Sequence, residues 1–500
     1  MGLRRLGSPF FLLTLLFLGL SAGCSTPALP LNERLNRVWH EAEIETARPR
    51  TISDAHFLRR LYLDLTGLPP KPEVILQFLK DKDPEKRIKI VDKLLVSDEF
   101  AVYQAHLWGD ELRIKAEFPI NLWPNAVQKY SRYIYETIRD NVPYDRFARE
   151  LLTSSGSNFR IPAANFFRAA ADRSPKGLAQ VTSQTFFGKP LSAWSVREQE
   201  QFIPFFTCIG YKSSKEWKEE FVFFKSPAPG SEMITAAVPG RRQVEIPAGT
   251  DPRKILADEI IASEPFAEAM VCRAWRRLFG REPVTPELSV LRREMAGRFR
   301  AGGFDLRQLY REILLSPAYS LPPGTPEEEK VFAAYPIRRL NAEQISDRLS
   351  MFLRKPFESY SSVIPEPFTF LPPGTRAAAI DDGSISSPFL DLMGKPPRDS
   401  GAPEERKDVI TGKQKLFLLN SGKLYWELQQ AQKHYLLKKN DNLKKRVERL
   451  YLAALARPVT PQELAFLEKK YKSTPPKLRG RFYTDLLWAL VNSNEFIYQY

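Results

Sequence analysis

Three copies of one phrase constrain the fold of this chain more than any other feature. The copies begin at Tyr62, Trp275 and Tyr451, where an apolar run leads into a proline-containing turn. Each copy is followed by a short phrase in which a serine precedes an aromatic residue. Repetition of this kind is typical of a structural unit used more than once. We expect each unit to be three helices packed on one another.

The residues around the turns predict where these helices begin and end. Gly67 and Gly280 are placed to end leading helices, whereas the third copy should end at Arg457, before a proline. Thr285 and Thr460 are placed to cap the next helix, but only Thr460 has a glutamate, Glu463, at the capping-box position. The later serines, each placed to cap a further helix, are Ser97, Ser316 and Ser493.

The chain is therefore predicted to be mainly α, with two helical lobes built from related three-helix units and a small β insert between them. The β-type runs are Glu220–Lys225, Met233–Val238 and Gln243–Ile246. Residues 354–407 are rich in Pro, Gly and Ser and predict a surface excursion. The expected divisions are a tether and first helix at 24–50, an N-terminal domain at 51–215, the insert at 216–250 and a C-terminal domain at 251–500.

The N-terminus has the features of a secretory signal over residues 1–23: two arginines, an apolar run and small residues. The apolar run, Phe10–Leu20, would rise only about 16 Å as a helix, too little to span a bilayer. Small residues directly before Cys24 are typical of a bacterial lipobox, so we expect a lipid at Cys24 and an exported lipoprotein facing the periplasm or cell surface. An ordinary signal peptide with a chance cysteine is the alternative.

Charge indicates the partners that are available to such a protein. The chain has 74 Lys and Arg against 59 Asp and Glu, and only Arg4 and Arg5 lie in the predicted signal. Outside the cytoplasm a basic surface meets lipid headgroups and acidic or sulfated glycans rather than nucleic acid. Lys444, Lys445 and Arg446 form the densest run, which is either a solvated helix face or a patch for polyanions.

Cofactor motifs are absent from the sequence. The cysteines are Cys24, Cys208 and Cys272, and the four histidines are scattered, without His-Glu-x-x-His, Cys-x-x-Cys or Cys-x-x-Cys-His. We therefore expect no metal site, no covalently attached haem and no other cofactor. Cys208 and Cys272 either pair or remain two thiols.

Carboxylates beside arginines are the only catalytic candidates. In the first half the candidates are Asp64, Asp110 and Arg113, with Glu111, Arg59 and Arg60 beside them. A similar group in the second half consists of Arg338, Arg339 and Glu343. A glycan hydrolase needs two such acids about 5 to 9 Å apart. The alternative is that these residues are ion pairs that hold helices together.

Tryptophans supply the remaining candidates for binding. Trp123, Trp194 and Trp217 lie in or near irregular segments and could stack on sugar rings, whereas Trp275, Trp426 and Trp488 fit core positions of helices.

Several phrases in one order resemble a known domain pair. Residues 57–70, 93–97, 108–113 and 143–147 resemble the planctomycete cytochrome-associated domain (domain of unknown function fifteen-forty-nine). Residues 335–344, 389–398, 418–421 and 486–496 resemble its C-terminal partner domain (fifteen-fifty-three). The pair occurs in secreted proteins of planctomycetes and verrucomicrobia, so the resemblance agrees with export.

The chain departs from that family at its cysteines. Members typically carry Cys-x-x-Cys-His after a Phe-x-Gly phrase, but here Phe187-Gly188 continues to Trp194 without it. A Cys-x-Cys-Glu-Arg phrase is reduced to Glu405-Arg406. Covalent haem needs those thiols and that histidine, so we do not expect this chain to be a cytochrome-type electron carrier.

Two function hypotheses remain. The first is a non-catalytic, envelope-anchored binding or scaffold protein for anionic polysaccharide and partner enzymes. The second is an enzyme that acts on glycans through Asp64 and Asp110.

Overall fold

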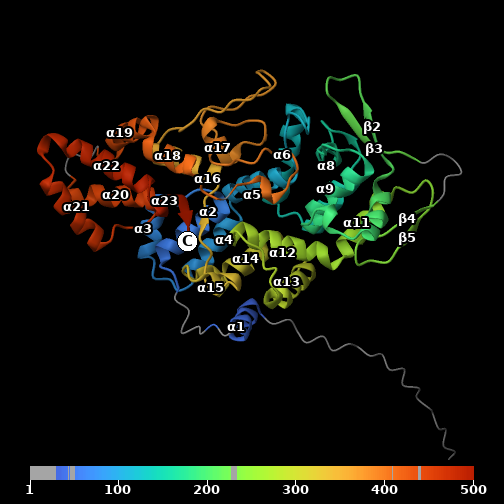
Figure 1. The fold of residues 1–500 in the computed structure, drawn as a ribbon, viewed down its shortest axis with the longest axis horizontal. Helices are drawn as coiled ribbons and strands as arrows, with labels where there is room; N and C mark the ends of the chain where they lie inside the picture. The colour runs from blue at the N-terminus through green and yellow to red at the C-terminus, as the bar shows by residue number, and fades with distance from the viewer. Residues whose placement is uncertain (1–29, 43, 45–50, 227–232, 408, 437–440) are drawn as a thin grey trace, which may run out of the picture.

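The computed structural model describes residues 30–42, 44, 51–226, 233–407, 409–436 and 441–500 (Figure 1). Within them lie 23 α-helices and three small sheets, which confirms the mainly α prediction. The predicted signal at 1–23 and Cys24 fall outside the described residues. None of the helices in the described part is both long and apolar enough to cross a bilayer.

The first repeat folds as three packed helices, and the helix predicted to begin at Ser97 follows them as a fourth, α5 (Asp98–Glu111). Helix α2 packs against the two helices that follow it, and Gly67 ends α2 with a φ of 71°, a conformation that glycine adopts without strain. A Cβ at Gly67 would lie 2.8 Å from the Tyr103 ring, so the turn has no room for a side chain. The unit comprises α2 (Asp54–Thr66), α3 (Pro72–Lys80) and α4 (Lys86–Leu95).

The second and third repeats have the same plan. In each, the leading helix contacts both of its successors. Ala456, with a φ of 57°, ends α20, so the predicted end at Arg457 is one residue late. The second unit comprises α12 (Glu264–Phe279), α13 (Ser289–Ala301) and α14 (Leu306–Leu314), and the third comprises α20 (Leu443–Leu455), α21 (Pro461–Ser473) and α22 (Arg479–Val491).

The caps differ between repeats, and the predictions that Thr285 and Ser316 cap helices are wrong. Thr460 and Glu463 form a complete capping box at α21. Thr285 makes no cap bond, and a 3-10 turn (Pro286–Leu288) precedes α13. Ser97 and Ser493 cap the following helices, whereas the Ser316 hydroxyl donates backwards to the Ile313 carbonyl oxygen at 2.7 Å.

The other helices surround these units. They include α6 (Pro124–Arg139), α7 (Tyr144–Thr153) and α11 (Pro252–Ala262). The remainder are α1 (Leu31–Glu41), α5 (Asp98–Glu111), α8 (Asn165–Arg168), α9 (Pro175–Phe187), α10 (Val196–Phe202), α15 (Pro326–Lys330), α16 (Ala342–Leu353), α17 (Pro388–Leu392), α18 (Gly412–Asn420), α19 (Gly422–Leu436) and α23 (Asn494–Ile497).

Strands occur at the three β-type runs, but they belong to two sheets rather than one insert. The first sheet has the order β1-β3-β2 and the second pairs β4 with β5, all antiparallel. A third pair, β6 with β7, joins the chain end to residues before α16. The strands are β1 (Gly156–Ser157), β2 (Ile209–Ser213), β3 (Glu220–Phe224), β4 (Ile234–Ala236), β5 (Val244–Ile246), β6 (Arg338–Arg339) and β7 (Tyr498–Gln499).

Apolar side chains form two cores whose boundary lies near residue 340. One core runs from Leu31 to Tyr335 and the other from Leu340 to Ile497. Leu63 of α2 belongs to the second core, whereas Leu452 of α20 belongs to the first. The two lobes therefore share helices at their junction.

The predicted surface excursion at residues 354–407 is largely exposed over 354–375, but residues 377–398 pack into the second core, so the prediction is wrong for that part. Phe357, Ile380, Phe389 and Met393 are buried in the second core, and Arg398 is 1% exposed. The Pro- and Gly-rich composition reflects tight turns between short buried pieces. Its upper loop, near residues 361–370, carries a series of exposed side chains (Figure 1).

Candidate functional site

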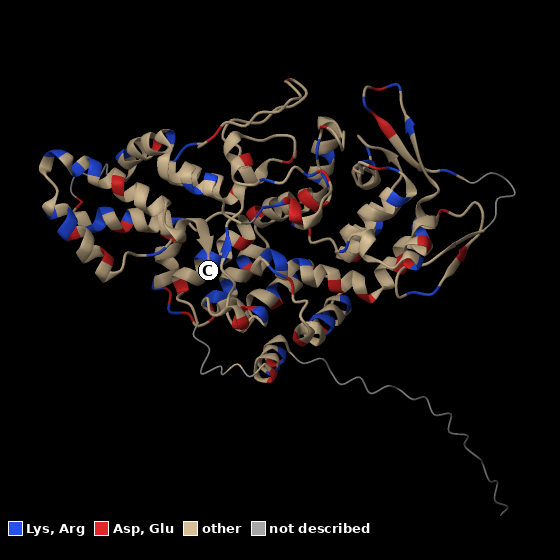
Figure 2. Cartoon of the chain, viewed as in Figure 1, with Lys and Arg blue, Asp and Glu red and all other residues tan. Residues whose placement is uncertain are grey.

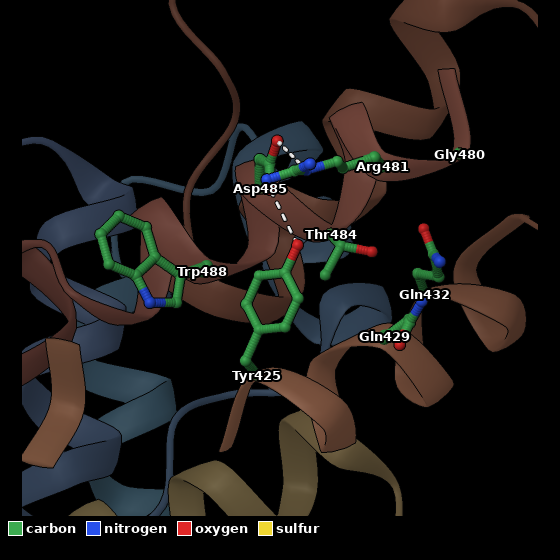
Figure 3. Close-up of a pocket in the computed structure, with 8 residues that line it drawn as sticks. All are labelled: Tyr425, Gln429, Gln432, Gly480, Arg481, Thr484, Asp485 and Trp488. Atoms are coloured by element: carbon green, nitrogen blue, oxygen red, sulfur yellow. Dashed lines mark hydrogen bonds and ion pairs between the residues drawn. The ribbon is translucent and has the colours of Figure 1, made fainter. Parts of the chain in front are cut away.

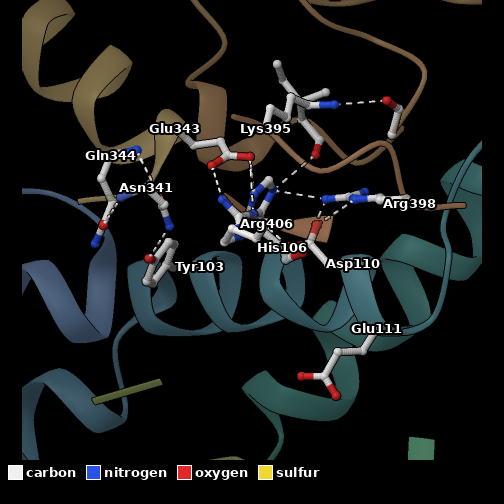
Figure 4. A network of polar contacts seen from close by, with 12 residues as sticks. Tyr103, His106, Asp110, Glu111, Asn341, Glu343, Gln344, Lys395, Arg398 and Arg406 are labelled. Atoms are coloured by element: carbon white, nitrogen blue, oxygen red, sulfur yellow. Dashed lines mark hydrogen bonds and ion pairs between the residues drawn. The ribbon is translucent and has the colours of Figure 1, made fainter. Parts of the chain in front are cut away.

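Helix α5 brings two adjacent acids to the junction between the lobes (Figure 4). Asp110 and Glu111 are consecutive on the helix, so their side chains point in different directions. Asp110 accepts bonds from Arg398 Nε at 2.8 Å through Oδ1 and from Arg406 Nη2 at 2.6 Å through Oδ2. Glu111 turns away to bind Arg273 and Arg277 of α12.

Arg406 joins Asp110 to a second buried carboxylate, Glu343, at the start of α16. Arg406 Nη1 lies 2.6 Å from Glu343 Oε2, and the Glu343 side chain has no solvent exposure. The second Glu343 oxygen lies 3.4 Å from His106 Nε2. Arg398, which binds Asp110, also donates from Nη2 to the His106 carbonyl oxygen at 3.2 Å. It therefore links Asp110 to the backbone of His106.

Asp64 lies in a separate ion pair. Its carboxylate binds Arg338 through one oxygen and accepts the Tyr319 hydroxyl at 2.6 Å through the other. The side chain has no solvent exposure. Burial opposes the charge of Arg338, but Asp64 outweighs it and raises the pKa of the guanidinium above its usual value.

The predicted arginines beside these acids bind backbone carbonyls instead. Arg113 donates to the Ala169 oxygen at 2.7 Å and to the Glu111 oxygen at 2.9 Å, and burial lowers its pKa to about 10. Arg59 donates to the Glu495 and Tyr498 oxygens. These buried arginines therefore anchor loops and the chain end, and Arg113 does not join Asp110.

A pocket of about 620 Å³ opens beside Asp110. Arg276, Arg277, Arg338, Arg339 and Arg406 line it, together with Asp110, Glu111 and Glu404. Arg276 binds Glu282, and Arg339 donates to the Met393 carbonyl oxygen. Each of the five arginines already binds a carboxylate or a backbone carbonyl oxygen of the protein.

A second candidate site, which we call the aromatic cluster, consists of the exposed Trp217 and Phe368, the half-buried Trp123 and the side chain of Lys218. The centroid of the Trp123 ring lies 6.4 Å from that of the Trp217 ring and 5.6 Å from that of the Phe368 ring. Lys218 Nζ lies 5.9 and 5.5 Å from the two indole centroids. Trp217 is 71% exposed and Phe368 is 51% exposed.

Backbone conformation holds the aromatic cluster in place. Trp123 and Lys218 both have positive φ values, 70° and 62°, which are uncommon for residues other than glycine. The loop before Trp123 is fixed to the 361–370 loop by a bond from the Val363 amide to Glu117 Oε1 at 3.1 Å. Strained residues of this kind concentrate at ligand-binding surfaces.

The structure separates the other predicted binding residues. Trp194 packs half-buried on Phe187 and Phe202, outside the aromatic cluster. Lys444 and Lys445 are exposed at the basic end formed by α20 to α22, whereas Arg446 lies half-buried over the Tyr483 ring (Figure 2).

The predicted core tryptophans have three different environments. Trp275 is fully buried, as predicted. Trp426 is 53% exposed beneath Lys355, so its assignment to the core is wrong: its position on α19 faces solvent. Trp488 is half-buried and lines a groove.

Comparison with known families explains the two halves of the chain. The model "Protein of unknown function (DUF1549)" matches residues 30–189, and "Protein of unknown function (DUF1553)" matches residues 252–471. The chain belongs to the DUF1549–DUF1553 proteins. No curated protein and no solved structure matches it.

The ion pairs of Asp64, Asp110 and Glu111 lie at the interface between these two domains. Asp64, Asp110 and Glu111 belong to the DUF1549 domain, and their arginine partners belong to the DUF1553 domain. The unmatched residues 190–251 contain β2 to β5. The sequence indicated the acids, but not Arg398 or His106, because no local pattern pairs residues nearly 300 positions apart.

Sulfur and metal chemistry add no further site in the described regions. Cys208 and Cys272 are both free and buried, and burial raises the pKa of Cys272 to about 12. No group of three or more His, Cys, Asp or Glu is arranged to hold a metal ion among the residues that the structure describes.

The interface should make the DUF1549–DUF1553 protein sensitive to acid. Burial alone would raise the pKa of Glu343, but Arg406 and His106 outweigh it, so its pKa lies well below the usual 4.5. Burial likewise opposes the charge of Asp110, but Arg406 and Arg398 lower its pKa below 3.8. A carboxyl whose pKa is lower in the folded state stabilises the fold at pH values above its pKa in the unfolded chain. It loses that contribution as the pH falls through its pKa in the folded state.

We therefore expect the free energy of unfolding to decrease as pH falls below 4.5. Urea unfolding at a series of pH values measures this slope. The Glu343→Gln variant should be less stable at neutral pH but have a shallower decrease, and an unchanged slope would contradict the assignment.

Proposed function

We propose that this protein is a non-catalytic binding protein whose aromatic cluster binds anionic polysaccharide. The exposed cluster is the observation that carries the proposal. Indole rings offer flat apolar faces to sugar rings, and the Lys218 ammonium beside them suits a carboxylate or sulfate on the same polymer. A single exposed Trp is ordinary, but three aromatic side chains gathered from separate loops form a surface suited to binding.

The interface acids support binding over hydrolysis. Both oxygens of Asp64 and both oxygens of Asp110 already accept bonds from protein groups. Asp64 is also closed to solvent. A hydrolase would need one carboxylate free to act on a water or on the glycosidic oxygen. The arrangement suits a structural role at the domain interface.

Retention on immobilised dextran sulfate tests the binding site. We expect Trp217→Ala to weaken binding about tenfold or more, as removal of a central aromatic contact usually does. Trp426→Ala is the matched control, because it removes another exposed Trp that lies beneath a lysine, 5.3 Å from Lys355 Nζ.

Three outcomes would contradict this proposal. One is equal retention of Trp217→Ala and the unchanged protein. The second is a loss of retention only in the Lys444→Ala/Lys445→Ala variant, which would assign polyanion binding to the basic end instead. The third is capture of a protein partner through Trp217 without any retention by polyanions, which would assign the cluster to protein binding.

The same proposal includes export and anchoring through a lipid at Cys24, on the sequence features of residues 1–24. We expect radiolabelled palmitate fed to expressing bacteria to label the unchanged protein and not the Cys24→Ala variant. Export of an unlabelled protein would contradict the anchor and leave the aromatic cluster unaffected.

A further inference from the structure

A groove between α19 and α22, which shares no residue with the aromatic cluster, has the chemistry of a second binding site (Figure 3). It has a volume of about 730 Å³. Tyr425, Gln429 and Gln432 contribute from α19 at helical spacing, and α22 contributes the opposite wall. The α22 residues are Gly480, Arg481, Thr484, Asp485 and Trp488.

Two oxygen acceptors of the groove, on Asp485 and Gln432, have positions that suit a ligand. The Tyr425 hydroxyl donates to Asp485 Oδ1 at 3.1 Å, and Arg481 Nε lies 3.7 Å from Asp485 Oδ2, so the carboxylate is positioned from two sides. Gln432 Oε1 is buried without a hydrogen-bond partner. A buried acceptor of this kind gains stability from a donor supplied by a ligand.

We propose that this groove binds a neutral oligosaccharide. A fixed carboxylate and amide side chains can receive and return hydrogen bonds from adjacent hydroxyls, while the Tyr425 and Trp488 rings supply apolar faces. The charges of Arg481 and Asp485 balance each other, so the groove has no net charge to attract a polyanion. The site is independent of the aromatic cluster and of the proposal made for it.

The lining also argues against a peptide. Helical peptides bind grooves through apolar anchors, and extended peptides bind free strand edges. None of the residues lining the groove is aliphatic, and both walls are helices. A polyhydroxylated ligand can form hydrogen bonds with the carboxylate and the amides of the groove and can pack on its two aromatic rings.

Gly480 provides a way to block the groove without removing a contact. A Cβ added there would meet nothing within 4 Å, and its backbone does not need the left-handed conformation. Gly480→Phe should therefore fold normally and obstruct the site. Gly412→Phe is the matched control, because Gly412 also lies in the first turn of a helix with open space around it.

The test is isothermal titration of the full chain with cellohexaose, xylohexaose and mannohexaose in turn, and with an oligogalacturonate as the acidic comparison. We expect at least one neutral hexasaccharide to bind, Gly480→Phe to abolish binding, and Asp485→Asn to weaken it about tenfold. Gly412→Phe and Trp217→Ala should bind as the unchanged protein does. Hydrogen exchange should slow in α19 and α22 when the sugar is added.

Three results would overturn the assignment: no binding of any neutral hexasaccharide, binding that survives Gly480→Phe, or preference for the oligogalacturonate. Because Asp485→Asn should leave retention on dextran sulfate unchanged, failure here is distinguishable from failure of the aromatic cluster.

Discussion

The Arg406→Met variant should lose about 3–5 kcal/mol of its free energy of unfolding, the usual cost of removing one partner from a buried ion pair. Arg406 is the only group that bonds both Asp110 and Glu343 among the described residues. Methionine preserves much of the volume but leaves two carboxylates without their shared cation. Urea unfolding followed by circular dichroism measures the loss.

Arg132→Met is the matched control for this variant. Arg132 forms an exposed pair with Glu136 at 2.7 Å on one helix, and such pairs contribute at most about 1 kcal/mol. Arg406→Lys, which keeps the charge but cannot bridge both acids, should fall between them. If Arg406→Met and Arg132→Met were equally stable, the network would not hold the domains together.

The Trp275→Ala variant should cost a similar amount, about 3–5 kcal/mol, through the cavity that it leaves. Trp275 is fully buried in the second repeat, stacked on Phe279 at 4.7 Å between ring centroids and 4.5 Å from Phe332. Its indole N–H also points to the Met295 sulfur at 3.4 Å. Thermal and urea unfolding both report the loss.

Trp217→Ala serves here as the control, since exposed substitutions usually change stability by less than about 0.5 kcal/mol. Trp275→Phe keeps one ring and should lose less than Trp275→Ala. Comparable stability of Trp275→Ala and Trp217→Ala would contradict the role of the repeat as a packed unit. The two variants also distinguish a core tryptophan from a binding tryptophan, because only Trp217→Ala should change polysaccharide binding.

The sequence was most informative where the structure is determined locally. The capping box at Thr460, its absence at Thr285 and the glycine at position 67 depend on residues within one turn of each other. Short-range hydrogen bonds and the steric freedom of glycine decide such features, so a pattern in the sequence can predict them.

Long-range pairing was not predictable in the same way. The acids were identified as candidates, but whether Asp110 would face a substrate or Arg406 depends on how α5 meets a segment almost 300 residues later. Segment 354–407 was assigned to the surface from composition, yet it supplies Arg398 and Arg406 to the interface. Likewise, nothing near Trp123 in the sequence indicates that Phe368 lies beside it.

The position of α1 determines how an anchored molecule would be oriented. The helix packs beneath α13, with Trp39 Nε1 donating to the Val331 carbonyl oxygen at 3.0 Å, while the β2–β3 hairpin and the 361–370 loop project from the opposite side (Figure 1). If the chain is attached to a membrane on the N-terminal side of α1, as proposed, the α1 side faces the bilayer, and the β2–β3 hairpin and the 361–370 loop face the surrounding medium.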